Sequence, residues 1–404
     1  MIFKLLSLGS MYPGSLDTFY LKYPDLNDLT YKEHIDFLLE NTTEFIGSYN
    51  RNFNRAGLFA ECIIANDTRL QNKWCIEKGI KTEDYQSIIL SQVKSFSPDI
   101  LWIEDLNYSD PGWLSDVKRE VKSIRLIIAY HCSPFNKKVL DNLKGVDFLI
   151  TCTPGLKTEI ENLGKKSFLV YHAFDKDLLS KISEKNEFTD DFIFSGSLIS
   201  GGNFHSKRIA LIESIIKADI GIGLYVNLEK NYRIRAKQLI YFLSSFLRNL
   251  KMDNLVERHK FFDYGKTWVD TYSGNLLKLK KKPVYGIDMY NLFNLSKVVL
   301  NYHIGVAGDY AGNMRMFEVT GIGSCLLTDN KKNIKDLFDP GSEIVVYDNA
   351  EDCAAKVKWL LEHESERQEI ALAGQKRTLA VHTVENRCIS IIDIINSELQ
   401  NLSK

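Results

Sequence analysis

The stretch NMRMFEVTGIGSCLLTDN, residues 313–330, predicts a short helix, a small-residue turn and a buried strand. Arg315 and Glu318 lie three residues apart at the start of that helix. A helix start has free backbone N–H groups and a partial positive charge, so it can bind phosphate. Arg315 would add a bidentate phosphate donor, and Glu318 could accept from ribose hydroxyls. The alternative is an ordinary surface pair, worth a few tenths of a kcal/mol.

The same order of amphipathic segments and short apolar, β-branched runs recurs along the whole chain, which indicates βαβ units and parallel sheets. The predicted strands of the first half are 2–8, 58–64, 99–103, 126–130, 148–151 and 168–171. Those of the second half are DFIFSGSL, DIGIGLYV, VVLNYHI, GSCLLTD and EIVVYD. A polar, charged segment, HAFDKDLLSKISEKNEFTDD, separates the two halves. We therefore predict an α/β protein with two Rossmann-like parallel-sheet domains, residues 1–175 and 190–383, facing a central cleft.

Composition limits the function classes. The chain has 404 residues and a net charge of −1, with no long block of like charge, so we expect no nucleic-acid partner. Its seven cysteines are scattered without a C-x-x-C pair, which predicts reduced thiols, no disulfide and no structural zinc. No apolar run reaches eighteen residues and the N-terminal one is too short for a signal peptide, so a cytoplasmic protein is expected.

One segment leaves two interpretations open. NYRIRAKQLIYFLSSFLRNLK, residues 231–251, has basic residues followed by an apolar run. It fits a helix on a membrane surface, which would make the protein peripheral at the inner face of the membrane. A helix packed on its own domain is the more ordinary interpretation and the one we predict.

From residue 313 onward the sequence resembles the C-terminal domain of GT-B glycosyltransferases of the group 1 type, most closely the branch related to spore-maturation CgeB-like proteins. The resemblance rests on Arg-x-Phe-Glu (315–318), Gly-x-Glu-Ile-Val-Val-Tyr (341–347), Ala-x-x-Gly (371–374) and His-Thr (382–383). Upstream, FIFSGSL and KKPVYGIDMYNLFNLSKVVLNYH are also similar to that family. It implies the GT-B fold, with the last helix, 384–402, crossing back onto the first domain.

The resemblance also implies an activity. Such enzymes transfer a hexosyl group from a UDP, GDP or dTDP sugar to a hydroxyl acceptor, here a glycan, a lipid-linked glycan or a protein in bacterial surface glycan or glycoprotein synthesis. No cofactor and no metal are expected. One motif points elsewhere, because Asp175-Lys176-Asp177 has the acid-x-acid spacing of metal-dependent GT-A enzymes. We interpret it as a linker acid pair, since it does not follow a central strand.

The donor site is expected at strand ends and helix starts of the second domain. The resemblance implies that Glu318 holds the ribose, that Val284–Gly286 contact the base, that Arg208 contacts the diphosphate and that Tyr310 replaces a second acid near the donor sugar. From the residues alone, Gly196 in an FSGSL turn and cationic His205 are further diphosphate candidates. The full donor set is Gly14, Gly196, His205, Arg208, Val284, Tyr285, Gly286, Tyr310, Asn313, Arg315 and Glu318.

Catalytic candidates come from the first domain. His131 ends the strand LIIAYH and could deprotonate an acceptor hydroxyl or bond a donor-sugar hydroxyl. Glu104, with Asp105 beside it, ends another strand and is an alternative general base. Asp17 follows the first strand and is placed near the acceptor, whereas Gly14 in the same segment is placed near the donor phosphate.

Two other functions remain open from the sequence. A sugar-nucleotide epimerase of the same fold would use similar residues without an acceptor. A non-catalytic nucleotide-sugar-binding protein is the second alternative, because Tyr310 stands where relatives carry an acid.

Overall fold

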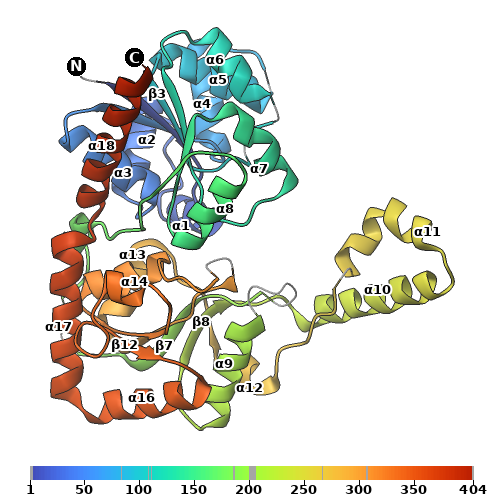
Figure 1. Ribbon diagram of the computed structural model, residues 1–404, viewed down its shortest axis with the longest axis vertical. Helices are drawn as coiled ribbons and strands as arrows, with labels where there is room; N and C mark the ends of the chain where they lie inside the picture. Colours follow the sequence, from blue (N-terminus) through green and yellow to red (C-terminus); the bar gives the residue numbers. More distant parts are fainter. Residues whose placement is uncertain are drawn as a thin grey trace.

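A computed structural model describes residues 3–82, 84–107, 109–110, 112–184, 187–199, 206–265, 267–305 and 308–402. Two six-stranded sheets, each wholly parallel in the pairs observed, form two domains that lie one above the other in Figure 1. The prediction of two Rossmann-like parallel-sheet domains is therefore confirmed.

The first sheet has the order β2-β1-β3-β4-β5-β6. Its strands are β1 (Lys4–Gly9), β2 (Phe59–Ile64), β3 (Ile100–Ile103), β4 (Leu126–Tyr130), β5 (Phe148–Thr151) and β6 (Ser167–Leu169). Its helices are α1 (Pro13–Lys22), α2 (Tyr31–Glu40), α3 (Phe45–Arg55), α4 (Thr68–Lys78), α5 (Tyr85–Phe96), α6 (Trp113–Glu120), α7 (Lys137–Asn142) and α8 (Pro154–Asn162). Strands β3 and β5 are buried at every position, as expected for parallel strands covered on both faces.

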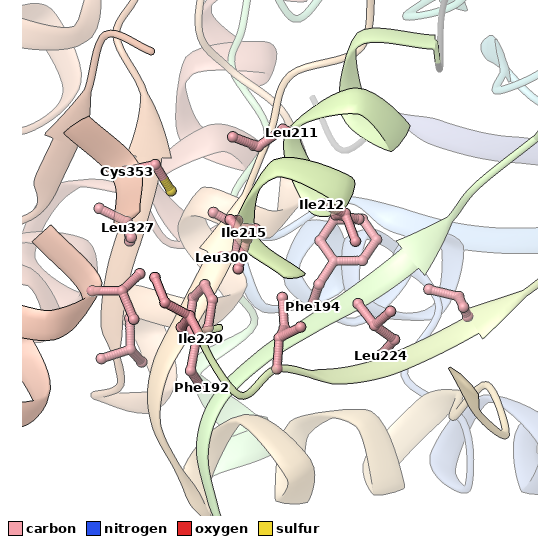
Figure 2. Close-up of a cluster of buried hydrophobic side chains, with 14 of the residues drawn as sticks. Phe192, Phe194, Leu211, Ile212, Ile215, Ile220, Leu224, Leu300, Leu327 and Cys353 are labelled. Carbon is pink, nitrogen blue, oxygen red and sulfur yellow. The ribbon is translucent and has the colours of Figure 1, made fainter. Parts of the chain in front are cut away.

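The second sheet has the order β12-β11-β10-β7-β8-β9. Its strands are β7 (Asp190–Ser197), β8 (Gly223–Asn227), β9 (Lys280–Lys281), β10 (Ser296–Asn301), β11 (Cys325–Asp329) and β12 (Val345–Tyr347). The helices with it are α9 (Ser206–Lys217), α12 (Gly274–Leu279), α13 (Gly286–Asn294), α14 (Met314–Ile322), α15 (Ile334–Leu337), α16 (Ala350–Glu362) and α17 (Glu364–Val381). Figure 2 shows Leu211, Ile212 and Ile215 of α9 packed over Phe192 and Phe194 of β7 in the core of this domain.

The last helix, α18 (Val384–Leu402), returns to the first domain. Its residues Cys388, Ile391 and Ile395 are buried in the same core as Tyr49 and Trp102 of the first domain. At the crossover, the N–H of Phe174 donates to the carbonyl of His382 at 2.9 Å, and the N–H of Val384 donates to the carbonyl of Phe174 at 3.0 Å. The Phe174 ring is seated directly on Gly321 of α14, where an added Cβ would lie 2.2 Å from the ring. Close packing therefore joins the two domains at the crossover.

The prediction that residues 231–251 pack on their own domain is wrong. In α10 (Asn231–Asn249) only Ile234 and Ser244 are buried. Figure 1 shows α10 and α11 (Asp253–Arg258) extending away from the second sheet. Apart from Ile234, the apolar residues of α10 are not part of the core of the second domain, to which α9 and α16 contribute. Among the described residues, no helix is both long and apolar enough to cross a membrane.

Candidate donor site between the two domains

Helix α14 begins as the sequence predicts, with Asn313 as its N-cap residue. The Asn313 side chain does not cap the helix. It instead exchanges two hydrogen bonds with the Asn301 side chain at the end of β10, at 2.7 and 3.2 Å. The N–H groups of the first turn are therefore not satisfied by a side-chain cap and can bind an anionic ligand.

The loop before α14 is held in place residue by residue. The N–H of Ala311 donates to the Asn333 side chain at 2.6 Å, and the N–H of Gly312 donates to Nε2 of His303 at 3.3 Å. Because Nε2 accepts, Nδ1 of His303 carries the hydrogen and donates to Asp329 at 2.7 Å. Sequence reasoning missed His303 and Asp329, although both polar residues lie at or just beyond the carboxyl ends of buried strands, where ligand sites collect.

The pair of Arg315 and Glu318 is not a surface pair. One nitrogen of Arg315 lies 2.9 Å from Oε2 of Glu318, with side chains only 17% and 7% exposed. The Tyr290 hydroxyl donates to the other carboxylate oxygen at 3.2 Å, and the Arg315 guanidinium lies over the Phe293 ring at 4.5 Å. Helix α13 therefore covers the pair, and the exposed-pair alternative raised from the sequence is wrong.

Arg208 on α9 provides a second cation. Its two terminal nitrogens donate to the carbonyls of Ser197 (2.9 Å) and Tyr302 (2.6 Å), while its Nε is buried and has no hydrogen-bond partner among the described residues. Burial, and next the charge of Arg315, lower the pKa of Arg208 to about 10, so it remains charged at neutral pH. A buried guanidinium without a carboxylate partner is stabilised by a bound anion.

Gly196 and His205 are the two other residues that the sequence suggested for binding the diphosphate. Gly196 does not lie in a turn, because β7 continues through Ser197 and pairs with β8; that detail of the prediction is wrong. Gly196 nevertheless lies beside Arg208, since an added Cβ would lie 3.9 Å from Nη1 of Arg208. His205 lies outside the described residues.

Two of the residues predicted to contact the nucleotide base, Tyr285 and Gly286, lie against the first domain. The Tyr285 ring lies against Gly14 of α1, where an added Cβ would be 2.8 Å from the ring. Gly286 begins α13 with a φ of 57°, a conformation that favours glycine, and faces Thr43 of the first domain. Val284 packs beside the core of the second domain. The structure thus brings Gly14, Tyr285 and Gly286, predicted from distant parts of the chain, to one interdomain contact.

A set of acids in the first domain extends this contact. The pKa of the Glu44 carboxyl is raised by burial and by the negative charge of Glu318. Burial, and next the charge of Glu44, raise the pKa of Glu104 to about 8. Glu44 is thus electrostatically coupled to the catalytic candidate Glu104 on one side and to Glu318 on the other. Tyr12 and Glu44 were missed because nothing in their local sequence marks them; only the meeting of the domains does.

The remaining candidates are not brought to this cluster by any described contact. His131 follows β4 and is 3% exposed; its ring packs on Phe135, and its Nε2 has no hydrogen-bond partner among the residues that the structure describes. Burial lowers the pKa of His131, so the ring is neutral at pH 7. Asp17 is exposed on α1, and Tyr310 is partly exposed in the loop before α14. Asp309 beside it pairs with Lys332 at 2.8 Å in an exposed ion pair.

The two acids of the acid-x-acid motif form ion pairs with arginines of α3. Asp175 pairs with Arg51 at 2.5 Å and Asp177 pairs with Arg55 at 2.7 Å. Both carboxylates therefore have protein partners, in agreement with our interpretation of a linker acid pair.

Comparisons with known proteins give one family match and several solved structures of the same fold. Residues 241–393 match the family model described as glycosyl transferase-like. The Anabaena protein HepE, solved with UDP-glucose, is 10% identical with a TM-score of 0.58, over 98% of this chain and 100% of that one. A glycosyltransferase from Rickettsia africae is 10% identical with a TM-score of 0.55, over 99% of each chain. The sucrose-phosphate synthase of Thermosynechococcus elongatus is 8% identical with a TM-score of 0.54, over 98% of this chain and 100% of that one.

No curated protein sequence matches the chain significantly. At such low identities the structural similarity shows the fold alone. The chain thus has the two-domain GT-B fold, and its residues 241–393 match a glycosyl transferase-like family model.

Proposed function

We propose that the chain is a glycosyltransferase that moves a hexosyl group from a nucleoside diphosphate sugar to a hydroxyl acceptor. The observation that carries this proposal is the start of α14, which has no side-chain cap and carries the buried Arg315–Glu318 pair. A buried carboxylate and a partly buried guanidinium at one helix start match the ribose and the diphosphate of a single ligand. The UDP-glucose bound to the structurally similar HepE supports a UDP-type donor.

Each part of the donor has a counterpart. The first-turn N–H groups, Arg315 and the unpaired Nε of Arg208 would bind the diphosphate. Each oxygen of Glu318 has one protein donor, Tyr290 or Arg315, and keeps a second lone pair for a ribose hydroxyl. The backbone of Val284–Gly286 would contact the base. Two guanidinium groups can neutralise the leaving diphosphate, so we propose transfer without a metal ion at the donor.

The transfer step needs a base on the acceptor side, and Glu104 is the candidate coupled to the cluster. Its carboxylate would take the proton of the acceptor hydroxyl while the acceptor oxygen bonds to the anomeric carbon. The bond from that carbon to the diphosphate oxygen breaks, and the electron pair leaves with the diphosphate. His131 and Asp17 remain proposals for contacts to the sugar and the acceptor.

The pH dependence of donor turnover tests this proposal. With UDP-glucose and no acceptor, we expect slow release of UDP by water, at a rate that rises about tenfold from pH 7 to pH 9, because a base with a pKa of about 8 must be ionised. Burial keeps nearby Cys62 and Tyr49 neutral in this range, which leaves Glu44 as the adjoining charge. Glu104→Gln should abolish the rise; Glu120→Gln, an exposed acid of the same domain, is the control.

The same reaction mixtures separate the alternatives. Conversion of UDP-glucose into an isomeric UDP-sugar would contradict the transferase and support an epimerase. Tight binding of the donor without release of UDP, across UDP, GDP and dTDP sugars and a panel of acceptors, would support a non-catalytic binding protein. An unchanged pH profile in Glu104→Gln would exclude Glu104 as the base.

We further propose that the acceptor is a lipid-linked glycan of bacterial surface glycan synthesis, reached at the inner face of the membrane. The arm formed by α10, α11 and η3 (Lys260–Gly265) exposes one apolar stripe at helical spacing, Leu239, Phe242, Leu243, Phe246 and Leu250. Phe242 and Phe246 are 59% and 60% exposed. Residues 231–265 contain seven Lys and Arg but only three Asp and Glu, a net charge of +4 (7 − 3). The net charge of the whole chain is −1. An apolar stripe with basic flanks suits an anionic lipid surface.

Vesicle sedimentation tests this arm. The protein should bind vesicles rich in phosphatidylglycerol, bind phosphatidylcholine vesicles weakly, and lose binding at high salt. The double variant Phe242→Glu, Phe246→Glu should bind at least tenfold more weakly without loss of stability, since both side chains are exposed. Leu21→Glu, an equally drastic change at a residue 84% exposed on α1, is the matched control. Equal vesicle binding by the double variant, or a dimer in solution that the double variant abolishes, would contradict the membrane assignment.

A further inference from the structure

Three residues that are far apart in the sequence meet at one end of the first sheet. Cys132, Cys152 and His172 follow the neighbouring strands β4, β5 and β6. One ligand atom from each, two sulfurs and a ring nitrogen, lie within 4.8 Å of one another. Around a tetrahedral Zn²⁺ with bonds of 2.0–2.3 Å, such atoms are separated by about 3.7 Å, so small side-chain movements suffice to bind an ion.

The surroundings favour a cation at this place. The Tyr130 hydroxyl is 3.0 Å from Nδ1 of His172, a hydrogen bond that fixes the orientation of the ring. Cys132 and His172 are partly exposed, which gives an ion a path in, whereas Cys152 is buried.

The second domain rests directly on this cluster. Gly312, with a φ of 146°, packs so closely that an added Cβ would be 2.6 Å from the carbonyl oxygen of Cys152 and 3.1 Å from the Tyr171 ring. Asn333 donates to the Tyr171 hydroxyl at 3.1 Å and also holds Ala311, in the loop before α14. An ion that fixes residues 152 and 172 would therefore fix the surface on which the loop before α14 is seated.

We propose that Cys132, Cys152 and His172 bind one thiophilic divalent cation of the zinc class, which stabilises the contact between the two domains. Two thiolates and an imidazole suit Zn²⁺ and do not suit Mg²⁺ or Ca²⁺, which prefer oxygen ligands. Three protein ligands leave the fourth position to water. This site goes beyond glycosyl transfer and is separate from the donor diphosphate, for which no metal is proposed.

The sequence pointed away from such a site, because it has no C-x-x-C pair. Local spacing is needed only when one loop supplies two ligands. Here each ligand follows a different strand, and the parallel sheet brings the three strand ends together. The signal available in the sequence was a Cys or His one to three residues after each of three consecutive predicted strands.

Metal titration of the untagged protein, freed of metal by a chelator and kept in a thiol-free reductant, tests the proposal. We expect one Zn²⁺ per chain by mass spectrometry of the metal, and near-ultraviolet thiolate charge-transfer bands when Co²⁺ replaces it. Zn²⁺ should raise the melting temperature by a few degrees. Cys152→Ser and His172→Gln should each lose the Co²⁺ bands or reduce their intensity strongly, together with the thermal shift. Cys75→Ser, at a cysteine outside the cluster, should retain both.

His172→Gln is the safer of the two variants, because His172 is partly exposed and should tolerate the change without unfolding. Failure of the parent protein to bind Zn²⁺ at one per chain would overturn the proposal. Co²⁺ charge-transfer bands of the same intensity in His172→Gln and in the parent protein would also overturn the proposal. Formation of a Cys132–Cys152 disulfide in air, in protein that binds no cation under reducing conditions, would assign the pair to redox chemistry instead.

Discussion

Arg208→Leu is expected to lower kcat for sugar transfer by about 10²- to 10³-fold, the usual effect of removing one preorganised group that stabilises a developing negative charge. In the part of the chain that the structure describes, Nε of Arg208 is buried without a hydrogen-bond partner, so it can donate to an anion without first breaking a protein contact. Arg208→Lys should recover part of the loss, because a lysine retains the charge but not the directed hydrogen bonds.

The control for this variant must separate charge from folding. Arg208 also holds the carbonyls of Ser197 and Tyr302, so its loss should lower the free energy of unfolding by about 1–3 kcal/mol. Arg367 is a matched residue, since it is buried, bonds the Leu360 carbonyl at 2.8 Å and lies on α17. Arg367→Leu should destabilise the protein with kcat per folded molecule unchanged. Equal kcat losses in the two variants would remove Arg208 from the donor site.

Glu318→Gln is expected to weaken nucleotide binding by about 1–3 kcal/mol, roughly 5- to 150-fold in Kd, because the ribose loses a charge-assisted hydrogen bond. Unlike a surface pair, the buried pair with Arg315 should also contribute to stability, so the free energy of unfolding should fall without ligand. Calorimetry with UDP and urea unfolding measure the two effects separately.

Glu364→Gln is the matched control, because Glu364 has the same i,i+3 relation to Arg367 but is 65% exposed. It should change neither nucleotide affinity nor stability by more than a few tenths of a kcal/mol. Glu318→Gln with the affinity of the parent would show that the carboxylate does not contact the nucleotide.

The elements of the fold were predictable because their signal is local. Buried parallel strands are apolar along their whole length, so β4 and β5 were predicted with their observed bounds, and α14 begins at Met314, close to the start that was predicted near Asn313. The outward course of α10 was not predictable. The apolar residues of α10 recur with the spacing of any amphipathic helix. Whether such a stripe packs on the protein core depends on whether other helices already cover that core, which the sequence of α10 does not show.

Some residues of the candidate site could also be predicted from local sequence, whereas others could not. Arg315, Glu318 and Asn313 were found from one short stretch, because a helix start displays its chemistry in sequence. The burial of the Arg315–Glu318 pair was not, since it depends on Tyr290 and Phe293 of α13. Tyr12 and Glu44 reach the cluster only through the meeting of the two domains, and a sequence gives no distance between residues of different domains.

A crystal structure of the protein with UDP tests the central claim most directly. The claim is that α14 is the nucleotide-binding helix. We expect the ribose hydroxyls within hydrogen-bond distance of Glu318, and the diphosphate at the first-turn N–H groups of α14 beside Arg315 and Arg208. A nucleotide bound elsewhere, for example in the cavity of about 340 Å³ near Lys4 and Trp74 of the first domain, with the Arg315–Glu318 pair untouched, would contradict it.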